Sequence, residues 1–148
     1  MLGGRVDHQL DEKKRMRIPA MYMNSFNGEP LFYVAYAPDC ITIMPKSVKD
    51  RRLGSLDEVD PGDPELMDAM RIIYASVMPV EVDNQGRAKI PKPIRERLHL
   101  EKEIVTIGLS DFIEVWDRET YEKKTGAMSL ADANKIYYSR KQRREQDV

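Results

Sequence analysis

The sequence contains little cysteine, tryptophan or histidine, with one Cys, one Trp and two His among 148 residues. A single cysteine, Cys40, excludes an intramolecular disulfide framework and suits a reducing compartment. His8 and His99 lie far apart, without the Cys or Asp neighbours of a zinc site, so no metal site is predicted. A glycine-rich phosphate loop and a G-x-S-x-G nucleophile elbow are also absent. The sequence therefore predicts no enzyme, no cofactor and no small-molecule substrate.

Long hydrophobic runs are missing as well. No apolar stretch approaches the length of a membrane span, and the N-terminus has no apolar signal-peptide core. We therefore expect a cytoplasmic protein that does not bind a membrane. The net charge of −1 and the sequence pI of about 6.2 argue weakly against nucleic-acid binding. The charge is uneven, however: the N-terminus and the tail after Lys135 are basic, whereas residues 46–70 are acidic.

An internal repeat is the most informative feature of this sequence. The segment D-E-K-K-R-M-R-I-P at residues 11–19 returns as D-N-Q-G-R-A-K-I-P at residues 83–91, 72 positions later. The same offset aligns residues 11–54 with residues 83–126 without a gap. A repeated supersecondary unit indicates a shared architecture and a shared working surface. Because each copy is too small to bury a generous core alone, we expect the copies to share one core or to assemble with other chains.

The second copy has the clearest secondary-structure pattern. Residues 78–82 and 87–90 are predicted as strands around a turn at 83–86, and Pro93 is typical of the first turn of a helix. That helix would bury Ile94, Leu98 and Leu100. Residues 104–107 and 112–116 predict a second hairpin, which is followed by a short helix from Asp117 to Lys124. In the first copy we expect a hairpin of residues 31–36 and 41–44, after a less helical region.

The sequence divides into four segments. Residues 1–54 hold the first repeat, 55–76 a linker and helix, 77–126 the second repeat, and 127–148 a C-terminal helix and tail. The helix before the second repeat is predicted to be capped by Asp63 and to bury Leu66, Met70 and Ile73. A capping-box pattern at Ser129 predicts the last helix, whose basic end, residues 140–144, is expected to fray.

The motif V-D-x-x-G-R-x-x-I-P at residues 82–91, with the later hairpin I-E-V-W-D at 113–117, resembles the SpoVT/AbrB superfamily. Two tandem copies resemble the MraZ family of bacterial regulators, and the resemblance covers residues 1 to about 126. It implies an α+β fold, a pseudo-symmetric swapped-hairpin β-barrel built from two tandem β-hairpin/helix repeats. It also implies a homo-oligomer in the form of a closed ring. Such a protein would be a nucleoid-associated transcriptional regulator of the cell division and cell-wall operon. It would bind double-stranded DNA at short direct repeats upstream of its own gene.

The D-x-x-x-R motif of each copy is the candidate DNA-binding site. Arg15 and Arg87 are the expected reading residues, because a guanidinium can contact the O6 and N7 atoms of guanine together. Their expected phosphate-contacting neighbours are Lys13, Lys14, Arg17 and Lys89. The residues expected to shape the turns are Asp11, Asp83 and Gly86. The alternative is structural: each Asp caps its turn and pairs with the Arg, which contributes only about 0–1 kcal/mol when exposed.

Two observations keep other functions open. The first copy has Lys14 where the second has Gly86, and lysine is uncommon if this position needs a positive φ. The segment 57–68 is acidic. An antitoxin-like module, or an assembly protein that forms rings without specific DNA binding, is therefore the alternative hypothesis. An antitoxin of this superfamily usually has one barrel copy and a long tail, so two copies with a short tail favour the regulator.

Overall fold

The computed structural model describes residues 1–54 and 56–147. Ser55 and Val148, which begin the expected linker and end the expected tail, lie outside the described residues. The chain forms two compact units, Met1–Arg118 and Glu119–Val148. The first unit contains both copies of the D-x-x-x-R motif.

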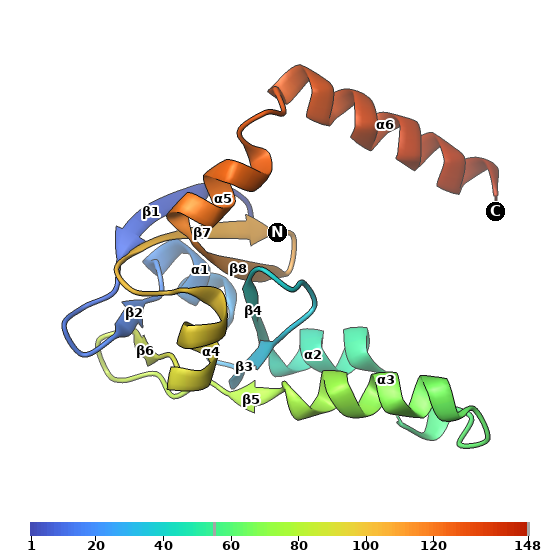
Figure 1. Ribbon diagram of the computed structural model, residues 1–148, viewed down its shortest axis with the longest axis horizontal. Coiled ribbons are helices and arrows are strands. Elements are labelled where there is room, and N and C mark those ends of the chain that lie inside the picture. The colour runs from blue at the N-terminus through green and yellow to red at the C-terminus, as the bar shows by residue number, and fades with distance from the viewer. Residues whose placement is uncertain (55, 148) are drawn as a thin grey trace. The chain divides into compact units, whose positions relative to one another are not determined.

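In residues 1–54, a pair of short strands precedes each of two short helices (Figure 1). These elements are β1 (Arg5–Gln9), β2 (Arg15–Arg17), α1 (Ala20–Ser25), β3 (Leu31–Val34), β4 (Ile41–Pro45) and α2 (Lys46–Leu53). The 3-10 turn η1 (Leu56–Glu58) and helix α3 (Pro64–Ala75) follow. The second copy contains β5 (Met78–Pro79), β6 (Arg87–Lys89), α4 (Lys92–Leu98), β7 (Glu103–Leu109), β8 (Phe112–Asp117) and α5 (Arg118–Thr125). The last helix is α6 (Leu130–Gln146).

The sequence repeat is also a structural repeat. Strands β2 and β6 begin at Arg15 and Arg87, and helices α1 and α4 begin at Ala20 and Lys92. Helices α2 and α5 span residues 46–53 and 118–125. All these pairs keep the offset of 72 residues, so the two segments fold as copies of one unit.

The two copies exchange strands in an antiparallel sheet of six strands with the order β1-β7-β8-β4-β3-β5. Strand β1 of the first copy pairs with β7 of the second, and β5 of the second copy pairs with β3 of the first. Strands β4 and β8 join the copies in the middle of the sheet. A separate two-stranded sheet pairs β2 with β6. The fold is therefore mixed α+β, and the strand pairings of the described residues give no closed barrel.

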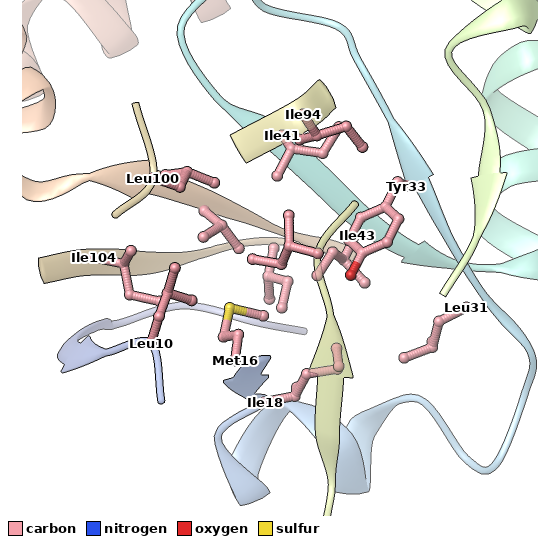
Figure 2. Close-up of a cluster of buried hydrophobic side chains, with 14 of the residues drawn as sticks. Leu10, Met16, Ile18, Leu31, Tyr33, Ile41, Ile43, Ile94, Leu100 and Ile104 are labelled. Atoms are coloured by element: carbon pink, nitrogen blue, oxygen red, sulfur yellow. The ribbon is translucent and has the colours of Figure 1, made fainter. Parts of the chain in front are cut away.

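The larger hydrophobic cluster contains side chains of both copies, as the size of each copy predicts, and a second, smaller cluster contains Val34, Met44 and Val48. Buried side chains from β2, β3 and β4 pack with others from α4 and β7 (Figure 2). Met16 and Tyr33 from the first copy and Ile104 from the second have no exposed surface. Burial of this kind contributes roughly 1.5–3 kcal/mol per large side chain, so the two copies depend on each other for stability.

Some expectations about the elements were wrong. Helix α3 buries none of its described side chains: Leu66 is 39% exposed, and Met70 and Ile73 are only half-buried. The expected strand at 78–82 is shorter, because β5 ends at Pro79 and Val82 forms an isolated bridge with Ala88. The basic segment 140–144 is helical in the described structure, because α6 continues through Gln146.

Two elements were not anticipated. Strand β1 lies just before the aligned segment, and subtracting 72 from the strand expected at residues 78–82 would have placed it. Helix α2 lies within the repeat, and subtracting 72 from the helix expected at residues 117–124 would have placed it. The predicted capping box at Ser129 is confirmed, because its hydroxyl accepts from the Asp132 N–H at 3.1 Å.

Candidate nucleic-acid interface

The first motif forms a tight turn held by one carboxylate. Asp11 Oδ1 accepts hydrogen bonds from the backbone N–H groups of Lys13 and Arg15, both at 2.9 Å. Asp11 Oδ2 accepts from Arg15 Nε at 2.9 Å. The Asp11 N–H donates to the Arg15 carbonyl at 3.0 Å and closes the loop. Aspartate therefore shapes the backbone and orients the arginine at the same time.

The second motif repeats this geometry. Asp83 Oδ1 accepts from the N–H groups of Gln85 and Arg87 at 2.9 and 3.0 Å, and Asp83 Oδ2 accepts from Arg87 Nε at 2.9 Å. The residue before each arginine has a left-handed backbone, with φ of 60° at Lys14 and 78° at Gly86. A type I turn followed by a left-handed residue is a common three-residue hairpin loop. The glycine position therefore does need a positive φ, and Lys14 adopts one.

Both motif carboxylates are held in their charged form. Hydrogen bonding from the Arg15 backbone N–H is the largest cause that lowers the pKa of Asp11. The same bond from the Arg87 backbone lowers the pKa of Asp83. The adjacent guanidinium groups act in the same direction, while partial burial opposes them. Both turns therefore keep their carboxylate charges at neutral pH.

Strands β2 and β6 bring the two motifs together as one ribbon. Arg15 lies opposite Lys89, Met16 opposite Ala88, and Arg17 opposite Arg87. Met16 and Ala88 are completely buried, so the ribbon turns them toward the core. Since side chains alternate along a strand, the cations lie on the opposite face of the ribbon. We call this face, formed by Arg15, Arg17, Arg87 and Lys89, the ribbon face.

Like charges oppose one another across the ribbon face. Directly opposed like charges destabilise an antiparallel pair, so this arrangement has a cost in the free protein. Asp83 relieves part of it, because its Oδ2 lies 3.6 Å from Arg15 Nη1 as well as 2.9 Å from Arg87 Nε. The side chains of Arg15 and Arg87 remain 25% and 28% exposed. The ribbon face is therefore a site at which an anion would relieve repulsion.

The predicted site residues do not all point the same way. Arg15, Arg17, Arg87 and Lys89 share the ribbon face, whereas the Lys14 ammonium donates a hydrogen bond to the Glu101 carbonyl at 2.7 Å. Lys13 lies in the first turn with its backbone bound to Asp11. The cross-copy contact of Arg15 with Asp83 was missed, since nothing in the repeat says that the two hairpins pair.

The comparisons with known proteins agree with this repeat. A sequence model of the family described as "MraZ protein, putative antitoxin-like" matches residues 73–141. The protein named transcriptional regulator MraZ from Leuconostoc mesenteroides is 30% identical over 125 residues, which cover 84% of this chain and 87% of that protein. This chain belongs to the MraZ family.

Two further relatives with the same name support the assignment. The MraZ-family protein from Leuconostoc citreum is also 30% identical over 125 residues, with 84% of this chain and 87% of that protein covered. The one from Thermomicrobium roseum is 28% identical over 121 residues, or 82% of this chain and 84% of that protein. Both are named transcriptional regulators, and no catalytic family is indicated.

Two other kinds of site were sought within residues 1–54 and 56–147 of this MraZ-family chain, a metal site and a membrane span. No group of three or more His, Cys, Asp or Glu side chains there is arranged to hold a metal ion. None of the described helices combines the length and the apolar composition of a membrane span.

Proposed function

We propose that this MraZ-family protein is a sequence-specific DNA-binding transcriptional regulator that acts in the cytoplasm, on the nucleoid. Its target would be short direct repeats upstream of its own gene, in the operon for cell division and the cell wall. The observation that carries the proposal is the ribbon face, where Arg15, Arg17, Arg87 and Lys89 lie on one side of the β2–β6 pair.

The geometry suits the major groove of DNA, which admits a two-stranded β-ribbon. Asp11 and Asp83 hold Nε of the motif arginines, so the terminal nitrogens of Arg87 would contact O6 and N7 of guanine. Those of Arg15 would do the same once DNA replaces the 3.6 Å ion pair of Arg15 Nη1 with Asp83. Arg17 and Lys89, which lie opposite Arg87 and Arg15, would neutralise phosphates, with Lys13 and Lys14 at the first turn. Asp11, Asp83 and Gly86 would orient the turns without touching DNA.

Few cations per chain suffice if many chains bind together. We propose that the six-stranded sheet and the ribbon are parts of a swapped-hairpin β-barrel, and that the chains form a closed ring. A ring would present the ribbon face repeatedly to repeated sites, so that weak contacts add through high effective concentration. Direct repeats, rather than a single palindrome, match such an arrangement.

The decisive experiment measures binding to the DNA upstream of the gene, at two salt concentrations. The wild type is compared with Arg15→Ala/Arg87→Ala and with a control, Lys46→Ala/Lys123→Ala, which removes two exposed charges outside the ribbon face. We expect the motif variant to assemble like the wild type but to lose roughly 1–3 kcal/mol of specificity for each arginine–guanine contact that is removed. The control should bind almost normally. Equal binding by the motif variant would refute the proposed site.

A second candidate function is an antitoxin-like or protein-interaction module, which the family description favours. In that case the exposed side chains of α6, such as Ile136, Tyr137 and Tyr138, would bind another protein. Assembled wild-type protein that shows no specific affinity for its upstream DNA would favour this candidate. Specific binding lost only in the motif variant would favour the regulator.

A further inference from the structure

Two helices of this chain lack a packing partner along one face. Helix α3 has 12 residues and α6 has 17, and neither buries a single described side chain. Isolated helices of about 12–15 residues are marginal in water, so packing against another surface normally stabilises them. On α3, Ile72 is 74% exposed, and on α6, Leu130 and Tyr137 are 78% and 60% exposed. Both helices therefore present apolar side chains that another surface would cover.

The exposed face of α3 is acidic at one end and apolar at the other. Glu65, Asp68, Ala69 and Ile72 are three or four residues apart, so they lie along one side of the helix. All four are exposed. Asp68 is paired within the helix with Arg71 at 2.8 Å, but this ion pair is itself exposed and contributes little. We call these four residues the α3 face.

Helix α6 carries the complementary pattern in reverse order. Ala133, Tyr137, Lys141 and Arg144 again lie along one side, with the apolar residues first and the basic residues last. Arg140 and Arg143 lie close by, so positive charges crowd the C-terminal half of the helix. Arg140 and Arg144 are four residues apart, and a like-charge pair at this spacing slightly destabilises a helix, which an anionic surface would relieve. We call Ala133, Tyr137, Lys141 and Arg144 the α6 face.

The spacing of the two faces matches in an antiparallel arrangement. Ile72 is seven residues from Glu65 and four from Asp68, and Tyr137 is seven residues from Arg144 and four from Lys141. At a rise of 1.5 Å per residue, seven residues span about 10 Å on either helix. If Ile72 packs on Tyr137, Asp68 therefore lies beside Lys141 and Glu65 beside Arg144. Antiparallel helices also have favourable dipole directions.

We propose that the α3 face of one chain packs antiparallel on the α6 face of a second copy of this chain. The two faces differ, so each copy offers one to each neighbour, and such head-to-tail contacts generate rings when the rotation closes. This inference rests on the proposed ring and names the surfaces that build it. It assigns Ile72 of α3 and Tyr137 of α6 to subunit contacts, and the basic end of α6 to protein rather than to DNA.

Engineered cysteines test which chains meet. The native Cys40 is completely buried, so the wild type should not cross-link. Ile72→Cys protein is mixed with Tyr137→Cys protein under dissociating conditions, reassembled and oxidised without DNA. We expect a covalent dimer that contains one chain of each kind, and a ladder of oligomers when one chain carries both cysteines. A double variant that cross-links only within single chains would overturn the proposal, as would a wild type of 17.2 kDa in solution.

Charge reversal provides an independent test. Glu65→Lys/Asp68→Lys should reduce the assembly to single chains, and so should Lys141→Glu/Arg144→Glu. Combining all four substitutions should restore the wild-type mass in light scattering, because the charges are complementary again. Circular dichroism checks that each variant is folded. If the α6 variant assembles normally but loses DNA affinity, the basic end contacts DNA and the proposal fails.

The assembly tests of the α3 and α6 faces can fail without the DNA-binding test of the ribbon face, and the reverse also holds. Assembly is measured without DNA, whereas the ribbon face is tested by Arg15→Ala/Arg87→Ala in assembled protein. Loss of DNA binding in that variant with intact cross-links would support both proposals. Intact DNA binding by a monomeric wild type would retain the ribbon face and reject the α3–α6 contact.

Discussion

Lys14 and Gly86 occupy the same position in the two copies, and both have a left-handed backbone, with φ of 60° and 78°. A residue with a Cβ adopts this conformation at a cost of about 1–2 kcal/mol. Lys14 offsets part of that cost through its hydrogen bond to the Glu101 carbonyl at 2.7 Å. We therefore expect Lys14→Gly to be about 1 kcal/mol more stable than Lys14→Ala in denaturant unfolding, because both variants lose the ammonium contact and only alanine keeps the strain.

The matched experiment in the second copy is Gly86→Ala. A Cβ at Gly86 would meet no atom within 4 Å, so only the positive φ opposes the substitution. It should therefore cost about 1 kcal/mol, similar to the difference between Lys14→Gly and Lys14→Ala. Equal stability of the wild type and the three variants would show that the turns relax without cost.

Asp83 has a larger role than Asp11, because it contacts the arginines of both motifs. Its Oδ2 lies 2.9 Å from Arg87 Nε and 3.6 Å from Arg15 Nη1, whereas the ion pair of Asp11 is with Arg15 alone among the described residues. We expect Asp83→Ala to lower the thermal midpoint more than Asp11→Ala at neutral pH. The difference should shrink below pH 4, where carboxylates become protonated and the stability that they contribute above the unfolded pKa of 3.8 is lost.

Scanning calorimetry of Asp11→Ala and Asp83→Ala, at neutral pH and below pH 4, measures the two thermal midpoints. Glu12→Ala, in the same first turn, controls for the loss of one negative charge. If Asp11→Ala were the more damaging substitution, the contact between Arg15 and Asp83 would have no energetic role.

The sequence repeat predicted much of this structure, and the reason is local. Alternating residues, turn residues and caps determine strands and helices over short distances, so the later hairpin and the shared core were confirmed. The positive φ at Lys14 could also be inferred, because the aligned residue is Gly86. The match to the MraZ family confirmed the interpretation of the repeat.

Long-range pairing could not be predicted in the same way. Strand β1 pairs with β7 across almost a hundred positions, and no local pattern specifies that partner. The opposition of Arg17 and Arg87 depends on the pairing of two hairpins that are far apart in sequence. The expected burial of Leu66 failed because an amphipathic pattern identifies an apolar face but not what covers it.

Gly108 permits the N-terminus to approach the sheet closely. A Cβ at this position would lie 2.6 Å from the Gly3 carbonyl oxygen and 2.8 Å from the Gly3 nitrogen, which are backbone atoms. Gly108→Ala should therefore displace the N-terminal segment from β7 and cost about 1–3 kcal/mol. Hydrogen exchange at the Leu2 amide, which bonds to the Ser110 carbonyl, would report the displacement.

Gly3→Ala is the matched control for this prediction. No atom lies within 4 Å of a Cβ built at Gly3, and its φ is not in the left-handed region. This variant should unfold like the wild type. Unchanged exchange at Leu2 in Gly108→Ala would mean that the segment packs differently from the contact described here.

His8 should make the stability depend on pH. Its Nε2 lies 2.7 Å from Thr106 Oγ1, and burial lowers the pKa of the imidazole, while the neighbouring Asp7 opposes that shift. A folded-state pKa below the unfolded value of 6.5 means that the folded state prefers the neutral ring. The contribution of His8 to the free energy of unfolding is therefore complete above pH 6.5 and is lost as the pH falls toward the folded pKa. His8→Gln should remove this loss between pH 7 and pH 5 in urea unfolding, and the same slope in both proteins would contradict the assignment.

Arg17 is expected to trade stability for affinity, because it opposes Arg87 across the ribbon. Removing one of two directly opposed like charges should stabilise the pair by roughly 0.2–1 kcal/mol, so Arg17→Ala should unfold at a slightly higher temperature. The same substitution should weaken DNA binding similarly on all sequences and reduce the salt slope by about 1, because one phosphate contact is lost. Lys46→Ala, an exposed charge on α2, should change neither quantity. A fall in both stability and affinity would instead mean that Arg17 holds the ribbon in place, since a residue that only contacts the anion cannot stabilise the free protein.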